Sequence, residues 1–208
     1  MKIPTAGRNP RDFSTGIGRS PKGFSNEFKL PNREQAIALL EKYRILPNIL
    51  AHSMQVNRVA VFLAKKLVKS GEKVNLNVVD MASLLHDIAK SRTIIEKRRD
   101  IHWVEAEEIL TEEGYPELGH ICKMHGFSEL NKSKNPSWEA KIVCYADSRV
   151  MHDRIVTLQE RMEDLKKRYK LGDDEPHLVI WKNLETEIFS KLKIKPNDVK
   201  KLVENEQS

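Results

Sequence analysis

The sequence predicts an all-α protein in which helices form a bundle around one core. Apolar residues recur at three- and four-residue spacing in several segments, which is the period of a helix that buries one face. No segment alternates apolar and polar residues as a half-buried strand does, and no internal repeat is visible. The length of 208 residues and the hydrophobic fraction of 39% allow one domain of ordinary size.

Three regions are expected along the chain. Residues 1–30 are rich in Gly, Pro, Ser and basic residues and have no helical period, which indicates an extended basic N-terminal arm. The arm either docks on the body of the protein or contacts a nucleic acid or a second subunit, and the sequence does not decide between these roles. A helical domain is expected over residues 31–172, followed by a C-terminal helical extension over residues 173–208.

The first two helices carry clear start and stop signals. Asn32, with Gln35 three residues later, predicts a capping box at the start of a short helix. Pro47 suits the first turn of the second helix, and Gly71 ends it. His52 occupies one position of the apolar stripe of this second helix. Taken alone, a histidine there is more often a satisfied core residue than a metal ligand.

The third helix is apolar nearly all round, which places it in the centre of the bundle. Asn77 is expected to cap its start, and the helix runs into the sequence Leu84-Leu85-His86-Asp87-Ile88-Ala89-Lys90. His86 and Asp87 interrupt the apolar pattern with two groups that are costly to bury without a partner. The pair therefore predicts a compensating group, and a metal ion is the favoured one.

The rest of the chain is also expected to be helical. One helix starts at His102 and closes at Gly114, the next runs from Pro116 towards His125, and residues 126–137 have the composition of a loop. A long helix is predicted from Trp138 to residue 169, with a buried seam at alternating three- and four-residue steps. Two shorter helices are expected over residues 179–192 and 197–204.

Four residues on these apolar faces predict a metal site. His52, His86, Asp87 and Asp147 lie on or beside three buried helical stripes, and facing helices of a bundle commonly build metal sites in this way. Imidazole nitrogens and carboxylate oxygens suit one or two divalent ions such as Fe, Mn, Co, Ni or Zn. The His-Asp dipeptide alone is weak support, because a second copy at residues 152–153 lies in a charged stretch and is interpreted as surface.

The order of these four residues resembles the HD-domain metal-dependent phosphohydrolase superfamily. The matching contexts are Leu46-Pro47-Asn48-Ile49-Leu50-Ala51-His52-Ser53, the sequence around His86-Asp87, and Tyr145-Ala146-Asp147. The resemblance covers residues 35–170 and implies an HD-domain-like helical bundle with a metal site in its core. It also implies a hydrolase that attacks a nucleotide or another phosphate ester with metal-activated water.

Two further histidines resemble the extra ligands of a dinuclear branch that includes symmetrical diadenosine tetraphosphate hydrolases. They are His102 and His125, and in that branch Asp87 would bridge the two metals. His120 competes with His125, which is favoured because it ends a helix before a glycine, while His102 can alternatively be a solvated N-terminal histidine. The segment after Asp147 does not match the branch, so the resemblance leaves the substrate open.

Basic residues near these positions are candidate phosphate contacts. Lys90, one turn beyond His86, is expected to act in catalysis and to bind the substrate, because phosphoryl transfer accumulates charge on the phosphoryl oxygens. Arg149 and Arg154 are further candidates for substrate binding, and Arg161 can reach a distal phosphate. The alternative for the three arginines is a solvated, salt-bridged helix face.

Charge and cysteine content narrow the remaining possibilities. The net charge of +6 suits an anionic partner, for which a phosphorylated small molecule, in particular a nucleotide, is favoured over a nucleic acid. Two cysteines without a CxxC pair, no apolar run that could span a bilayer and no signal region indicate a cytoplasmic protein. The alternative functions are a non-catalytic HD-type nucleotide-sensing module and a basic nucleic-acid-binding protein. A homodimer through the long seam remains open.

Overall fold

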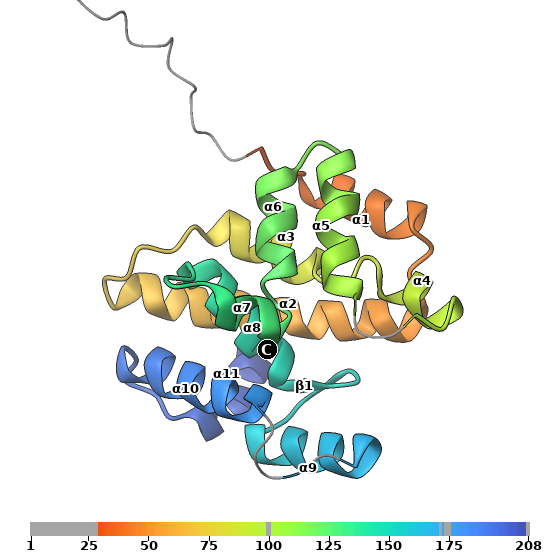
Figure 1. Cartoon of the computed structure of the whole chain (residues 1–208). Coiled ribbons are helices and arrows are strands. Elements are labelled where there is room, and N and C mark those ends of the chain that lie inside the picture. The colour runs from red at the N-terminus through yellow and green to blue at the C-terminus, as the bar shows by residue number, and fades with distance from the viewer. Residues whose placement is uncertain (1–28, 99–100, 171, 173–175, 207–208) are drawn as a thin grey trace, which may run out of the picture.

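The computed structural model describes residues 29–98, 101–170, 172 and 176–206. Helices make up most of this part of the chain (Figure 1). In chain order the elements are α1 (Arg33–Lys42), α2 (Pro47–Lys69), α3 (Leu76–Leu85), α4 (Lys90–Ile95), α5 (His102–Glu112), α6 (Pro116–Lys123), α7 (Phe127–Lys132), α8 (Trp138–Ser148), β1 (Val150–Met151), β2 (Arg154–Ile155), α9 (Leu158–Tyr169), α10 (Pro176–Ser190), the 3-10 helix η1 (Pro196–Asp198) and α11 (Val199–Asn205). The predicted all-α class is confirmed.

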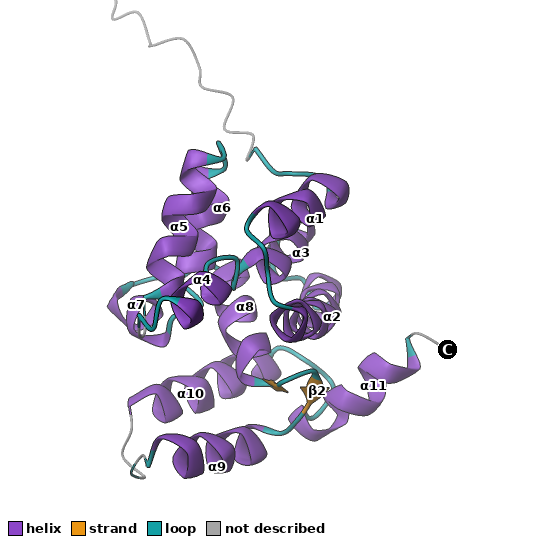
Figure 2. Cartoon of the chain, turned by 90° about the vertical axis from the view of Figure 1, so that its right-hand side faces the viewer, coloured by secondary structure: helices purple, strands orange, loops and turns teal. Residues whose placement is uncertain are grey.

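The helix α2 lies at the centre of the bundle, and α3 and α8 pack against it (Figure 1). The helices α5 and α6 form an antiparallel pair that joins this centre through α3 and α8. Seen from the side, α9, α10 and α11 lie below the other helices (Figure 2). Side chains of α10 and α11, among them Leu178, Ile188 and Val203, belong to the same buried cluster as those of α2 and α8. The C-terminal helices therefore share the core of the domain.

Capping explains where several of these helices begin. The capping box between Asn32 and Gln35 is present, as the sequence predicts. The third helix is capped by Asn75, whose side chain accepts from the backbone N–H groups of Asn77 and Val78, so the expectation of Asn77 as the cap is wrong. None of the described helices combines the length and the apolar character that a membrane span requires.

The long helix predicted from Trp138 is two helices. α8 ends at Ser148, and a short antiparallel hairpin pairs Val150 with Ile155 before α9 begins. His152 turns the hairpin with a φ of 58°, in the left-handed region. Each helix buries its own apolar stripe, and the two stripes are in phase, so periodicity alone could not separate them. Strands of two residues are too short to show an alternating pattern, so no feature of the sequence indicated them.

The segment expected to be a loop contains the short helix α7, in which only Leu130 is buried. One buried residue in six gives no apolar period, so this element left no signal in the sequence. The third helix is shorter than expected and ends at Leu85, and residues 86–89 form turns before α4 starts. This interruption places His86 and Asp87 on a compact turn at the centre of the bundle.

Candidate metal centre

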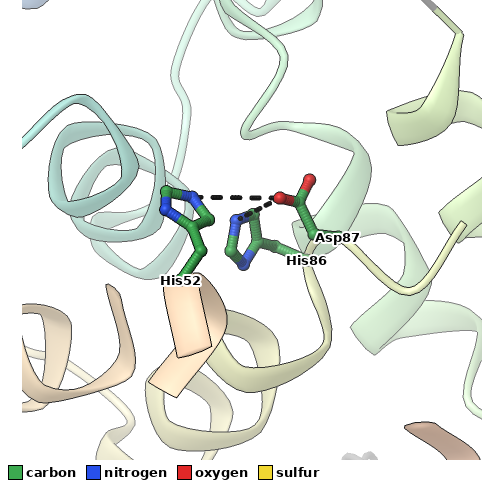
Figure 3. Close-up of side chains that lie close together, drawn as sticks. All are labelled: His52, His86 and Asp87. Carbon is green, nitrogen blue, oxygen red and sulfur yellow. Dashed lines mark ion pairs between the residues drawn. The ribbon is translucent and has the colours of Figure 1, made fainter. Parts of the chain in front are cut away.

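Asp87 is the central residue of a polar cluster inside the bundle. It follows α3 on the turn, where His86 is fully buried and Asp87 is 1% exposed. His52, on α2, points towards both of them, as Figure 3 shows. The remaining groups come from α5 and the end of α6, which approach Asp87 itself, and from α8, which approaches His52 and His86.

One oxygen of Asp87 faces the first group of side chains. Its Oδ2 lies 3.4 Å from Nε2 of His86 and 3.8 Å from Nε2 of His52. Asp147 joins the group from α8, with its Oδ1 at 2.9 Å from Nε2 of His52 and 3.8 Å from Nε2 of His86. Two imidazoles and two carboxylates therefore present their donor atoms to a common point.

The other oxygen of Asp87 faces a second group. Its Oδ1 lies 3.3 Å from Nε2 of His102 and 3.7 Å from Nε2 of His125, and these two nitrogens are 3.2 Å apart. All six predicted ligands thus lie in one cluster, and Asp87 stands between its halves. A carboxylate in this position can bridge two cations.

The outer nitrogens of three histidines are held by backbone carbonyl groups. Nδ1 of His86 donates to the Ser83 carbonyl at 2.8 Å, and Nδ1 of His125 donates to the Cys122 carbonyl at 2.5 Å. Nδ1 of His52 donates to the carbonyl of His152 at 2.8 Å. A carbonyl oxygen only accepts, so each Nδ1 carries the proton and each Nε2 can offer a lone pair to a metal.

The nitrogen and oxygen atoms of the cluster do not satisfy one another's hydrogen-bonding needs, and a bound cation would satisfy them. Nε2 of His86 and Oδ1 of Asp87 are buried without a hydrogen-bond partner in the described part of the chain. The Nε2 lone pair of a neutral His52 would also face Oδ1 of Asp147 at 2.9 Å, an unfavourable contact unless a proton or a metal ion lies between them. Because buried polar atoms are rarely left unpaired, this arrangement suits divalent metal ions bound by nitrogen and oxygen.

The charges of the cluster shift the pKa values of its members. Burial raises the pKa of Asp87 and of Asp147, but the charges of Lys90 and His86 at Asp87, and the hydrogen bond with His52 at Asp147, outweigh burial and hold both pKa values below the ordinary one. Burial lowers the pKa of His86, yet the two carboxylates raise it above the ordinary value. Both carboxylates are therefore ionised at neutral pH and ready to bind a cation.

His125 behaves in the opposite way. Burial, together with positive charge on His86 and His102, lowers the pKa of His125 to about 3. This imidazole is neutral at any pH where the protein is ordinarily handled, and a metal would not have to displace a proton from it.

Lys90 lies next to the carboxylate at the centre. Its Nζ donates to Oδ2 of Asp87 at 2.7 Å, while 27% of the Lys90 side chain is exposed. Burial lowers the pKa of Lys90, but Asp87 and Asp147 raise it above its ordinary value, so the ammonium group stays charged. The structure thus places a partly exposed cation beside the candidate ligands.

Arg149 does not face the cluster, which corrects the expectation that it binds substrate. Its guanidinium is 1% exposed, and Nε donates to the Val156 carbonyl at 2.7 Å. Nη1 donates to the Tyr145 hydroxyl at 2.6 Å and Nη2 to the Pro196 carbonyl at 3.1 Å. All three nitrogens are used, so Arg149 fastens the hairpin and η1 to α8.

Arg154 is exposed on the second strand of the hairpin. It lines a surface cavity of about 420 Å³ together with Glu160 and Lys200. No contact joins Arg154 to the six candidate ligands within the described ranges, so the structure does not bring it to the cluster as the sequence predicts.

The alternative ligand His120 and the second His-Asp pair both have their side chains outside the cluster. The side chain of His120 is 62% exposed and pairs with Glu107 on α5. His152 and Asp153 are exposed at the tip of the hairpin. The backbone carbonyl of His152 nevertheless holds His52, a contact that sequence reasoning missed and that no motif could have signalled.

Comparisons with known proteins indicate a family for this chain. The model of the HD-domain family matches residues 49–151, a range that contains the six candidate ligands. "Uncharacterized protein MJ0778" from Methanocaldococcus jannaschii is 30% identical over 159 residues, which cover 70% of this chain and 89% of that protein. No solved structure matches the chain.

Proposed function

The chain belongs to the HD-domain family, and we propose that it is a metal-dependent phosphohydrolase acting on a nucleotide or another phosphate ester. The observation that carries this proposal is the placement of Asp87. Its two oxygens face two separate histidine groups, and one of these oxygens is buried without a hydrogen-bond partner in the described part of the chain. A buried carboxylate oxygen without a partner is costly, and a cation beside it would compensate that cost.

In this proposal the protein binds one or two divalent ions through the six clustered residues. Fe, Mn, Co, Ni and Zn all suit this mixture of imidazole and carboxylate ligands. Bound metal would supply a water of lowered pKa and would polarise the phosphoryl oxygens. One ion would be held on the Oδ2 side of Asp87 by His52, His86 and Asp147. A second ion would be held on the Oδ1 side by His102 and His125.

Lys90 is the side chain proposed to contact the reacting phosphate. Its ammonium group is already oriented by Asp87 and remains partly exposed. Charge builds up on the phosphoryl oxygens during transfer, and a cation fixed beside them stabilises that charge without having to reorganise. Asp87 therefore has two tasks, to hold the metal and to position Lys90.

The proposal is tested by metal analysis of the purified protein and by phosphate release from a panel of nucleotides and simpler phosphate esters. His86→Ala is expected to lose bound metal and to lower phosphate release by at least about 100-fold, because it removes a buried ligand. His120→Ala is the matched control, since it removes an exposed histidine outside the cluster. Full activity in His86→Ala would contradict the proposal.

A second measurement separates loss of the metal from loss of the fold. Asp87→Asn keeps the shape of the side chain but removes the charge, and its helical circular dichroism is expected to match that of the wild type.

If metal-loaded wild type binds nucleotides and releases no phosphate from any of them, the chain is instead a nucleotide-sensing module.

A further inference from the structure

Trp103 packs against the second group of histidines. It is the second residue of α5, directly after the candidate ligand His102, and its side chain is half-buried. Its indole meets the imidazole of His102 edge to face, with the ring centroids 4.9 Å apart and the planes at 73°. It meets the ring of His125 in the same way, at 6.4 Å and 88°. Aromatic rings attract one another at these separations and angles, so Trp103 supports both candidate ligands on the Oδ1 side of Asp87.

The indole also covers the backbone that follows His125. A Cβ added to Gly126 would lie 2.8 Å from Cγ and from Cδ2 of the indole, closer than such atoms approach one another in proteins. The ring therefore lies directly on the glycine, and only a residue without a side chain leaves room for it there. Trp103 thus joins the start of α5, which supplies His102, to the chain just after α6, which supplies His125.

His102 differs from the other three candidate histidine ligands in how it is held. Those three donate through Nδ1 to a backbone carbonyl group, at 2.5–2.8 Å. Within the described ranges Nδ1 of His102 makes no such hydrogen bond, whereas its Nε2 lies 3.2 Å from Nε2 of His125 and 3.3 Å from Oδ1 of Asp87. A metal-bound imidazole is ordinarily fixed by a partner on its outer side. At His102 the ring contact with Trp103 is the interaction that can serve this purpose.

We propose that Trp103 is a positioning residue for a metal ion on the Oδ1 side of Asp87, where it holds His102 beside His125. This inference rests on the proposed function for the presence of two ions, but it concerns metal binding and does not require turnover. Without the indole, His102 could rotate at the start of its helix, and the ion would have to immobilise it. Loss of the indole should therefore weaken the binding of one ion and spare the other.

The test is a titration of metal-free protein with Co²⁺, followed by calorimetry and by the visible absorption of the bound ion, which changes with its ligands. The variants are Trp103→Leu, Trp103→Phe and the control Trp138→Leu. Trp138 is another half-buried tryptophan, at the start of α8, and its Nε1 donates to Glu72 at 2.9 Å. Its variant therefore controls for the loss of an indole away from the histidines. Thermal midpoints are measured, and each titration is carried out well below the midpoint, where the variant is folded.

Wild type is expected to bind two ions per chain. Trp103→Leu should weaken the second ion by about 10- to 100-fold, the usual cost of losing an outer partner of a metal ligand, and should change the first by less than about threefold. Trp103→Phe should recover most of the affinity for the second ion, because the phenyl ring keeps an aromatic contact with His102. Trp138→Leu should bind both ions as the wild type does.

An unchanged affinity for the second ion in Trp103→Leu would overturn the inference. The same holds for an equal loss in both leucine variants, for an equal weakening of both ions in Trp103→Leu, and for a Trp103→Phe variant that binds as weakly as Trp103→Leu. A wild type that binds only one ion would also overturn it.

These outcomes are distinct from those that test the proposed function. If wild type hydrolyses esters and Trp103→Leu binds the second ion with normal affinity, the inference about Trp103 fails alone. If wild type binds two ions and hydrolyses no ester, the proposed function fails, and the Co²⁺ affinities still decide the role of Trp103.

Discussion

The buried imidazole of His125 gives the metal-free protein a specific dependence on pH. Its pKa is about 3 in the folded protein, because burial and the charges of His86 and His102 disfavour its protonated form. In the unfolded chain a histidine has a pKa of about 6.5. Between these values the unfolded state binds more protons than the folded state, so this group destabilises the protein as the pH falls below about 6.5.

The size of the effect follows from the two pKa values. At pH 5 the unfolded imidazole is almost fully protonated and the folded one is neutral, which lowers the free energy of unfolding by about 2 kcal/mol relative to pH 7.5. The substitution His125→Asn removes this titration and keeps a side-chain N–H for the Cys122 carbonyl. The substitution lowers the free energy of unfolding by some amount at pH 7.5. At pH 5 the wild type is itself weakened by His125, so the difference in the free energy of unfolding between wild type and variant should be about 2 kcal/mol smaller.

The assay is urea unfolding of metal-free wild type and variant at both pH values, followed by circular dichroism. His120→Asn is the control, because this exposed histidine lies outside the cluster and its surface ion pair with Glu107 is worth at most about 1 kcal/mol. A stability difference between wild type and His125→Asn that is the same at pH 5 and pH 7.5 would refute the reasoning.

Three further substitutions test how the cluster is supported. Arg149→Met should lower the free energy of unfolding by about 2–4 kcal/mol in urea, because it removes a buried guanidinium that makes three hydrogen bonds. Gly126→Ala would bring a Cβ to 2.8 Å from the indole of Trp103, so we expect altered tryptophan fluorescence and a loss of about 1–3 kcal/mol. Gly119→Ala would place a Cβ 2.9 Å from the backbone oxygen of Glu107, and a similar loss of stability is expected with metal content unchanged.

The helices and the cluster of candidate ligands could both be predicted from the sequence, and for the same physical reason. A helix that buries one face repeats its apolar residues at a fixed period, and a polar residue on that face is conspicuous because its burial is costly. His52 and Asp147 interrupt two such stripes, and the pair His86-Asp87 interrupts a third. The sequence could therefore indicate that these side chains meet, although not at what distances.

Arg149 shows where such reasoning stops. Its position two residues after Asp147 suggested a phosphate contact, but that inference assumed that the helix continues. The chain leaves the helix at this point, and the guanidinium instead binds carbonyl groups of the hairpin and η1. The break did have one local signal, the capping box between Thr157 and Glu160 that starts α9. A continuous apolar seam concealed it.

The orientation of the histidines depends on groups that no side-chain pattern encodes. Three of them donate through Nδ1 to backbone carbonyls, and this common arrangement turns their Nε2 atoms towards the cluster. For His86 and His125 the carbonyl lies three residues earlier, at the end of the helix that each residue follows, so the local fold supplies it. For His52 the carbonyl belongs to His152, one hundred residues away, and it is available only because the hairpin interrupts the helical seam. The element that the sequence did not reveal is thus the one that orients the first ligand of the predicted site.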